Sequence, residues 1–302
     1  MAIEITMLGT ACMVPTKERN VQAIFVDMHG EGLLFDCGEG TQRQMNIAGI
    51  NRNRVRKIFI SHWHGDHVSG LVGLLQTITN SENPQKIIIF GPRETKDRIA
   101  YLLRSVSFES NKINLEIREL DPVYVEKAYE NEEYYVECAY LEHKPKCLGY
   151  SLVEKDKLRI QMPKVKKLGL REGPLLGKLQ RGQSVEVKGQ TIKPEDVAIT
   201  QKGKKLTIIM DTRPCENAIE LAREADLLIC ESAYTAEHEE KAISYKHMTT
   251  KDAGLIATKA EVKKLIITHF SQRYKTAKEL GEEIKTFFPN SETAYDFMKV
   301  KL

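Results

Sequence analysis

The chain has 302 residues, of which 41% are hydrophobic and 29% charged, and its formal net charge at pH 7 is +3, which is ordinary for a globular protein. No apolar run approaches the ~18 residues needed to span a bilayer, and Glu4 lies where a signal peptide would have its basic start. We therefore expect a soluble protein of the cytoplasm, with no membrane partner.

Apolar and alternating runs predict strands, in chain order, at residues 3–9, 21–28, 32–38, 56–62, 86–92, 205–212, 226–232 and 264–270. Helical patterns lie between them, at 68–80, 94–106, 216–225, 250–260 and 276–288. The middle of the chain is more hairpin-like, at 114–120, 134–143 and 148–155. Strands covered by helices on both outer faces predict an α/β sandwich, formed as a single domain over residues 1–302.

The six cysteines are scattered without a C-x-x-C pair, which predicts reduced thiols that fill the core.

A Gly- and Lys-rich region interrupts the pattern from about residue 155 to 190. Between Lys155 and Arg181 it holds nine Lys or Arg residues against Asp156 and Glu172, a charge of 9 − 2 = +7, so the rest of the chain carries 3 − 7 = −4. Such a segment is a candidate contact for a polyanion, although a solvated loop face explains the charge alone equally well. Its leucines need apolar partners, which favours a structured insertion: Leu168, Leu170, Leu175, Leu176 and Leu179.

Four potential metal ligands lie within the stretch "HWHGDH": His62, His64, Asp66 and His67. Gly65 permits a sharp bend, so these side chains can converge from one loop. Imidazole and carboxylate are ligands that zinc prefers. One loop cannot complete two tetrahedra, and three further candidates follow apolar strands at their carboxyl ends, where sites gather in open α/β sheets: His143, Asp211 and His269.

The pattern H-x-H-x-D-H, followed by His, Asp and His at strand ends, resembles the metallo-β-lactamase superfamily. By that resemblance the fold is an αββα sandwich with two Zn²⁺ ions between its sheets. One zinc would be held by His62, His64, His143 and Asp211. The other would be held by Asp66, His67, His269 and the same Asp211. A shared carboxylate is reasonable because two close dipositive ions need shared negative charge.

Further motifs are similar to those of the tRNase Z family: "PTKERN" (15–20), "FDCGEGTQRQM" (35–45), "GPLLGKLQRG" (173–182), "HMTT" (247–250) and "THFSQRY" (268–274). The resemblance implies a zinc-dependent endoribonuclease that removes the 3′ trailer from precursor tRNA, leaving a 3′-hydroxyl on the tRNA and a 5′-phosphate on the trailer. It also implies a homodimer with a protruding basic arm, residues 155–183, that grips the tRNA. The residues expected to contact tRNA are Lys17, Arg19, Asn20, Lys164, Lys166, Lys167, Gly173, Pro174, Lys178 and Arg273.

Phosphodiester hydrolysis needs hydroxide at neutral pH and stabilisation of an anionic transition state, which two zinc ions supply. Asp66 is expected to orient the water and accept its proton. By resemblance, His247 would protonate the leaving 3′ oxygen and Glu231 would hold its ring. Two alternatives stay open. A small-molecule hydrolase, such as a thioesterase or an aryl phosphodiesterase or sulfatase, needs no basic arm. A noncatalytic RNA-binding module is the other alternative, and it would lack one or more of the metal ligands.

Overall fold

The computed structural model describes residues 2–82, 85–108, 114–170, 172–187 and 189–302. The chain forms two compact units. The larger unit comprises Met1–Tyr129, Val136–Leu152 and Lys205–Leu302, and the smaller comprises Glu130–Tyr135 and Val153–Lys204. The predicted arm, residues 155–183, lies within the smaller unit, which continues to Lys204.

The first seven-stranded sheet contains β1 (Ile3–Gly9), β3 (Ala23–Met28), β4 (Glu31–Phe35), β5 (Val55–Phe59), β6 (Ile87–Pro92), β7 (Leu115–Leu120) and β20 (Lys299–Lys301). Their order is β20-β1-β3-β4-β5-β6-β7. Strands β4 to β7 run parallel to one another, so the carboxyl ends of β4, β5 and β6 lie at one edge of the sheet.

The second seven-stranded sheet contains β8 (Glu126–Glu130), β9 (Tyr134–Leu141), β10 (Cys147–Glu154), β15 (Lys205–Ile209), β16 (Leu227–Glu231), β17 (Leu265–Thr268) and β19 (Ser291–Thr293). Their order is β19-β17-β16-β15-β10-β9-β8. Strands β15, β16, β17 and β19 are parallel, so their carboxyl ends also share one edge. A short pair, β2 (Ala11–Cys12) and β18 (Phe270–Ser271), joins the N-terminal segment to the chain after β17.

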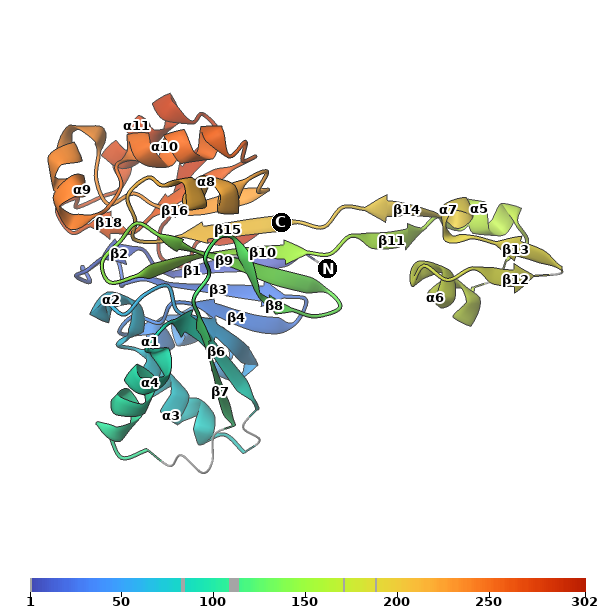
Figure 1. The fold of residues 1–302 in the computed structure, drawn as a ribbon, viewed down its shortest axis with the longest axis horizontal. Coiled ribbons are helices and arrows are strands. Elements are labelled where there is room, and N and C mark those ends of the chain that lie inside the picture. Colours follow the sequence, from blue (N-terminus) through green and yellow to red (C-terminus); the bar gives the residue numbers. More distant parts are fainter. Residues whose placement is uncertain (1, 83–84, 109–113, 171, 188) are drawn as a thin grey trace. The chain divides into compact units, whose positions relative to one another are not determined.

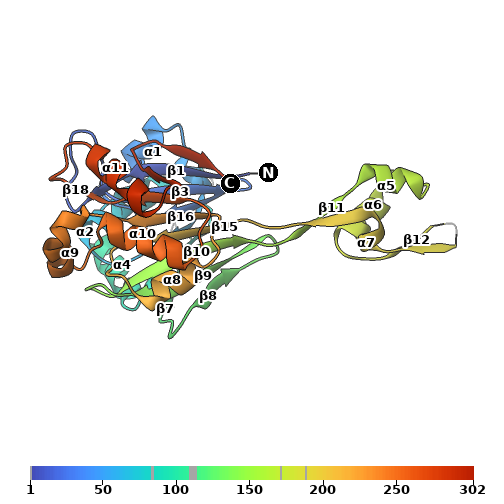
Figure 2. The same cartoon turned by 90° about the horizontal axis from the view of Figure 1, so that it is seen from above.

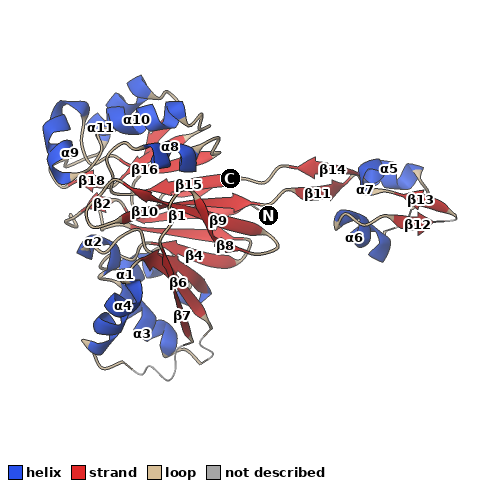
Figure 3. Cartoon of the chain, viewed as in Figure 1, coloured by secondary structure: helices blue, strands red, loops and turns tan. Residues whose placement is uncertain are grey.

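Helices cover the outer faces of both sheets (Figures 1 and 3). On the first sheet lie α1 (Thr41–Ile47), α2 (Gly65–Val68), α3 (Leu71–Thr79) and α4 (Thr95–Arg104), with the 3₁₀ turn η1 (Arg52–Arg54). On the second lie α8 (Glu216–Ala222), α9 (Glu239–Tyr245), α10 (Thr250–Lys259) and α11 (Lys278–Phe287), with the 3₁₀ turn η3 (Ala236–His238).

The inner faces of the two sheets pack against each other through buried side chains. Tyr150 on β10 lies between the sheets, with its ring centroid 6.0 Å from that of Phe35 and 5.4 Å from that of Phe59. Its hydroxyl donates a hydrogen bond of 2.7 Å to the Ile60 carbonyl, so the polar tip of this buried ring is satisfied. These layers form the αββα sandwich that the sequence predicts.

Each predicted strand and helix of the sandwich is found within a few residues of its expected bounds. The segment 114–120 differs, because it forms β7 and pairs in parallel with β6 instead of joining the hairpin-like middle. Alternation shows which residues face the core, but it does not identify the neighbouring strand. The expected strand 264–270 is divided at His269, whose φ of 63° interrupts the extended backbone.

The smaller unit, whose helices and strands are drawn in Figure 2, has a hydrophobic core of its own. It consists of β11 (Lys157–Ile160), α5 (Met162–Lys167), α6 (Pro174–Gln180), β12 (Val185–Val187), β13 (Gln190–Ile192), α7 (Pro194–Val197) and β14 (Ala198–Gln201). The core is formed by Val165, Leu170, Leu179, Val185, Ile192 and Val197. The expected packing is thus found for Leu170, Leu179 and the partly buried Leu176, whereas Leu168 and Leu175 stay 36% and 38% exposed. Arg171 lies outside the described residues.

Among the described residues, no helix combines the length and the apolar character that a membrane crossing requires.

Candidate metal centre and catalytic site

The structure brings together all seven predicted metal ligands at the facing edges of the two sheets. The loop after β5 carries His62 and His64, and α2 carries Asp66 and His67. From the second sheet come the residues that follow β9, β15 and β17, namely His143, Asp211 and His269. Two groups have ligand atoms within 4.8 Å of one another: His62, His64, His143 and Asp211 in one, and Asp66, His67 and His269 in the other.

Asp211 faces both groups, one with each carboxylate oxygen. Its Oδ2 lies 3.5 Å from His62 Nε2 and 3.7 Å from His143 Nε2. Its Oδ1 lies 3.4 Å from both His67 Nε2 and His269 Nε2. This is the arrangement that a carboxylate shared between two cations requires.

The donor atoms suit bound metal better than hydrogen bonds among themselves. His67 Nε2 and His269 Nε2 lie only 3.2 Å apart and face the same carboxylates. Within the described chain, the buried atoms Asp66 Oδ1 and Asp211 Oδ1 have no hydrogen-bond partner. Buried polar atoms are seldom left unpaired without a functional reason. Together with the nitrogen and oxygen ligand set, these unpaired atoms fit zinc.

Neighbouring groups orient two of the imidazoles. Asp36 Oδ2 lies 2.7 Å from His67 Nδ1, and Asp36 also accepts hydrogen bonds from the Ser61 backbone N–H at 2.7 Å and hydroxyl at 2.8 Å. His143 Nδ1 lies 2.9 Å from the Lys246 carbonyl. Donation from Nδ1 in both rings leaves the Nε2 lone pair directed at the metal positions.

We did not predict Asp36 or Ser61 as site residues from the sequence. Asp36 directly follows the apolar strand β4, which is parallel to β5, so its position at a strand end was a usable signal.

Burial affects the first ligand group in a simple way. It lowers the pKa of His62, His64 and His143 below the ordinary value of a histidine. Rings that resist protonation keep a lone pair free for a metal, because only neutral imidazole coordinates.

The second group attracts positive charge. At His67 and His269 burial opposes protonation, but the Asp211 carboxylate outweighs it and raises both pKa values well above the ordinary value. Burial likewise opposes the charge of Asp66, but hydrogen bonds from His269 and His67 hold its pKa well below the usual range. Two buried carboxylates that stay ionised need compensating cations nearby.

His247 lies beside the metal ligands and is fixed by Glu231, as the resemblance implied. Its Nδ1 is 3.0 Å from Glu231 Oε1 and 3.9 Å from Asp211 Oδ2. Glu231 is fully buried. Burial opposes protonation of His247, but the Glu231 and Asp211 carboxylates outweigh it and raise the pKa of the ring to about 12. The two carboxylates therefore favour the protonated form of this ring.

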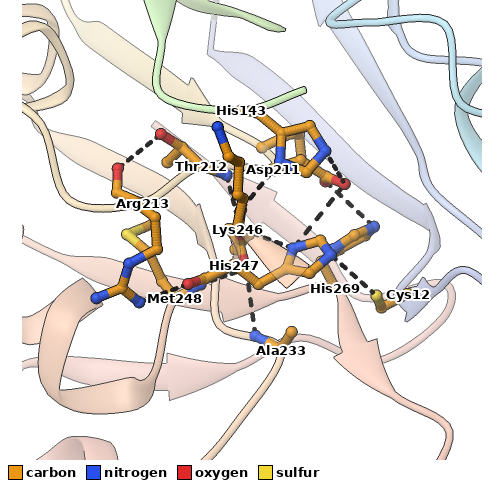
Figure 4. Close-up of polar contacts among 12 residues, drawn as sticks. Cys12, His143, Asp211, Thr212, Arg213, Ala233, Lys246, His247, Met248 and His269 are labelled. Carbon is orange, nitrogen blue, oxygen red and sulfur yellow. Dashed lines mark hydrogen bonds and ion pairs between the residues drawn. The ribbon is translucent and has the colours of Figure 1, made fainter. Parts of the chain in front are cut away.

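Arg213 holds the backbone of His247 in place, a role that the sequence did not reveal (Figure 4). Its Nη1 donates to the His247 carbonyl at 2.7 Å and to Asp252 Oδ2 at 3.1 Å. Asp252 in turn caps α10 in a capping box with Thr249. Arg213 thus links the turn after Asp211 to the start of α10, with the His247 segment between them.

A cavity of about 730 Å³ opens onto these residues. It is lined by Cys12, Met13, His64, Asp66, Asp211, Tyr234, Lys241, Tyr245, His247, Ser271, Gln272 and Arg273. Cys12 belongs to the buried core, as predicted, and it also lines this cavity, with its Sγ 3.9 Å from His247 Nε2. All six thiols are free, and the remaining four buried ones are Cys37, Cys138, Cys147 and Cys230.

The residues expected to contact RNA near the site differ in exposure. Lys17 and Arg273 are exposed, and Arg273 lines the cavity. Arg19 is only 6% exposed, and its guanidinium donates to the Tyr274 carbonyl at 2.6 Å. Asn20 donates from its side chain to the Glu39 carbonyl at 2.8 Å. Arg19 and Asn20 therefore hold the loops around the cavity through hydrogen bonds to backbone carbonyls within the protein.

Within the smaller unit, the remaining predicted RNA contacts are exposed: Lys164, Lys166, Lys167, Gly173, Pro174 and Lys178. None of these four lysines forms an ion pair with another residue of the described part of that unit. Their charge is thus free to meet a polyanion.

The chain is similar to known proteins over almost its whole length. Ribonuclease Z from Bacillus cereus is 40% identical over 302 residues, with 97% of both chains covered. The chain belongs to the ribonuclease Z family. It is accordingly an endoribonuclease, a hydrolase of phosphodiester bonds. Human tRNase Z, short form, is 27% identical, with a TM-score of 0.72 and 98% of each chain covered.

Two further matches describe the fold more broadly. The metallo-β-lactamase fold protein YhfI from Bacillus subtilis has a TM-score of 0.71 at 15% identity, with 100% of this chain and 99% of that chain covered. A family model described as anti-Pycsar protein Apyc1 matches residues 3–161. That region ends before Asp211 and His269, whereas the ribonuclease Z match covers 97% of the chain.

Proposed function

We propose that the chain removes the 3′ trailer from precursor tRNA with two zinc ions per chain, leaving a 3′-hydroxyl on the tRNA and a 5′-phosphate on the trailer. The observation that carries this proposal is the position of Asp211, whose two oxygens face two separate ligand groups. Bound zinc would lower the pKa of a water to make a nucleophile and would offset negative charge on the phosphate in the transition state.

Asp66 takes the proton of the attacking water in this proposal. Its Oδ2 accepts a hydrogen bond from the Met13 backbone N–H at 2.8 Å, which fixes the carboxylate. Its Oδ1 has no hydrogen-bond partner among the described residues, so this oxygen is free to accept a proton. The zinc that His67, His269 and Asp211 would hold would place positive charge beside it.

His247 supplies the proton that the leaving group needs. Its Nδ1 is engaged with Glu231, so the transferable proton resides on Nε2, near Cys12 and facing the cavity. A ribose 3′ oxygen leaves poorly as an alkoxide, and proton donation from a fixed histidine lowers that barrier. Glu231 acts on the reaction through His247 alone, by holding the ring.

The smaller unit binds the body of the tRNA in this proposal. RNA duplexes are recognised through backbone and shape more than through base edges, and exposed lysines meet phosphates without sequence preference. Lys164, Lys166 and Lys167 on α5 and Lys178 on α6 provide such charges on a folded support.

The test is to incubate the protein with a precursor tRNA that carries a 3′ trailer and to map both new ends. We expect one cut that depends on added zinc and is lost in Asp66→Asn. Release of the trailer with a 3′-phosphate left on the tRNA would contradict the mechanism. Hydrolysis of thioesters, aryl phosphodiesters or aryl sulfates without any cut in the RNA would favour the alternative of a small-molecule hydrolase.

We further propose that the chain works as a homodimer in the cytoplasm, as the resemblance to the tRNase Z family implies. Light scattering of the purified protein tests the assembly, and a mass of one chain, 34.4 kDa, would refute it. A second test mixes a variant that lacks the arm lysines with Asp66→Asn. Cleavage returns in the mixture only if the intact arm of one subunit delivers tRNA to the intact metal site of its partner.

A further inference from the structure

Two large side chains that line the cavity have no part in metal binding or proton transfer. Both are mostly exposed, Tyr245 at 63% and Met13 at 69%. The exposed cations Lys241 and Arg273 line the same cavity. A flat aromatic ring and a polarisable thioether beside cations are suited to a nucleobase and its phosphate, because stacking needs only a π face and the cation meets the backbone.

Both apolar side chains are fixed to the site by their backbones. Met13 has a φ of 62°, which is unfavourable for a residue with a side chain, and its N–H donates to Asp66 Oδ2 at 2.8 Å. Tyr245 ends α9, and the carbonyl of the next residue, Lys246, lies 2.9 Å from His143 Nδ1. The backbone at each of these two residues is therefore linked to a proposed metal ligand, Asp66 or His143.

We infer that Tyr245 and Met13 form a binding subsite for one nucleobase of the RNA, that of the last nucleotide kept on the tRNA. This inference rests on the function proposed above. His247 gives its proton to the 3′ oxygen of that nucleotide, so its ribose lies on the His247 side of the phosphate. Tyr245 precedes His247 by two residues, and both line the cavity. Lys241, one helical turn before Tyr245, meets the phosphate on the 5′ side of the same nucleotide.

The cavity is large enough for this occupant, because 730 Å³ lies within the usual range for small-molecule sites, about 300–1,000 Å³. Stacking tolerates any base, so the subsite gives position without strict sequence preference. Placing the last kept base fixes which phosphodiester reaches the metals. Tyr245 is thus assigned as a positioning residue for the cut.

The test compares two precursor tRNAs, one intact and one with an abasic ribose as the last nucleotide before the cut. We expect the missing base to lower kcat/KM of the wild-type enzyme about 5- to 100-fold. Tyr245→Ala should lose a similar factor on the intact RNA and lose nothing further on the abasic RNA, because the two changes remove the same contact. Tyr245→Phe should retain most of the wild-type rate on both RNAs.

Tyr101→Ala is the matched control, since Tyr101 is 69% exposed on α4 and does not line the cavity. It should match the wild type on both RNAs. If loss of the base lowers kcat/KM by the same factor in the wild type and in Tyr245→Ala, the proposed subsite is wrong. A third RNA, abasic at the first trailer nucleotide, should show no such coupling, and coupling there would overturn the assignment to the kept nucleotide.

Two further outcomes are separable. Failure of the wild type to cut the intact precursor would refute the proposed function itself, whatever the variants do. If thermal melting shows that Tyr245→Ala is unfolded, Met13→Ala replaces it in the same comparison, and additive losses there would also reject the subsite. A shifted or blurred cut position in Tyr245→Ala, mapped by sequencing the ends, would support positioning over a purely structural role.

Discussion

Removal of the His247 ring tests the proposed chemistry most directly. His247→Ala deletes a group whose Nδ1 lies 3.0 Å from Glu231 Oε1 and whose Nε2 lies 3.9 Å from Cys12 Sγ. None of the metal-ligand groups needs this ring to reach four ligands, because Asp211 completes each of them. We therefore expect zinc binding to survive the substitution.

The expected effect depends on the leaving group. A positioned general acid contributes about 10²- to 10⁴-fold, so RNA cleavage should slow by that factor. A nitrophenolate leaves without a proton, so the loss on bis(p-nitrophenyl) phosphate should stay within about 10-fold. The ratio of the two losses, rather than either one, identifies the proton donor.

Glu231 is a harder residue to perturb cleanly than His247. Its Oε1 accepts from the Thr212 backbone N–H at 2.8 Å, and its Oε2 accepts from Met248 N–H at 3.2 Å and Ala233 N–H at 3.3 Å. In Glu231→Gln the new NH₂ group faces at least one backbone donor, which costs about 1–3 kcal/mol of folding stability. We expect the double variant His247→Ala/Glu231→Gln to cleave RNA little more slowly than His247→Ala. Glu231 acts on the reaction only by holding the His247 ring, so it has no further effect once the ring is gone.

The assay is single-turnover cleavage of a labelled precursor tRNA, in parallel with colorimetric ester hydrolysis and metal analysis. His238→Ala is the matched control, since His238 lies in η3 outside the cavity lining and should leave both activities intact. Equal losses on the two substrates, or zinc lost from His247→Ala, would show that His247 is a ligand or a structural residue.

Three other predictions follow from the same geometry. Asp211→Ala should lower tightly bound zinc from two equivalents to below one, measured by elemental analysis, and loss of one equivalent alone would refute the bridge. Arg213→Lys should reduce RNA cleavage about 10-fold with zinc retained, because one charged hydrogen bond to the His247 carbonyl is weakened. Unchanged cleavage would contradict the role of Arg213 in holding the His247 backbone. Alanine at the three α5 lysines, Lys164, Lys166 and Lys167, should lower the slope of log K for tRNA binding against log salt concentration by about 2–3. Alanine at three exposed lysines elsewhere, Lys259, Lys278 and Lys285, should leave this slope unchanged.

The ligands could be predicted from the sequence because each follows a signal that is local in the chain. His269 comes directly after the parallel strand β17 and His62 three residues after the parallel strand β5, and parallel strands end at a common edge. Asp66 and His67 follow a glycine that lets the loop turn. The period of the apolar residues and the ends of the runs were enough to place these side chains together.

The remaining site residues depend on contacts between distant segments, which no local pattern reports. Arg213 is an unremarkable arginine until its guanidinium reaches the His247 carbonyl, 34 residues away. Arg19 lies in a polar loop that predicts exposure, yet it is buried against the Tyr274 carbonyl, 255 residues further along the chain. Cys12 lies in a short strand like any core thiol, and its neighbour in space, His247, is 235 residues away.

Some of the backbone strain lies at the metal ligands. Nine described residues other than glycine have a positive φ, and four of them belong to the site: Met13, Asp36, Lys246 and His269. Each would cost of order 1–3 kcal/mol in isolation. Their polar groups are engaged there: the Met13 N–H with Asp66, the Asp36 carboxylate with His67, and the Lys246 carbonyl with His143.

Strain of this kind persists only where other interactions outweigh it. The polar contacts of Met13, Asp36 and Lys246 each end on a proposed ligand, so the ligands and the strained turns hold one another in position. Metal binding should therefore stabilise these turns as well as the ligands. It follows that zinc removal should loosen the Tyr245–His247 segment through the lost hold on His143, and hydrogen exchange at the His247 amide, which donates to the Ala242 carbonyl at 2.8 Å, should then quicken while exchange in the core of α10 stays slow. Unchanged exchange at His247 after chelation would show that the segment is rigid on its own and that the coupling is absent.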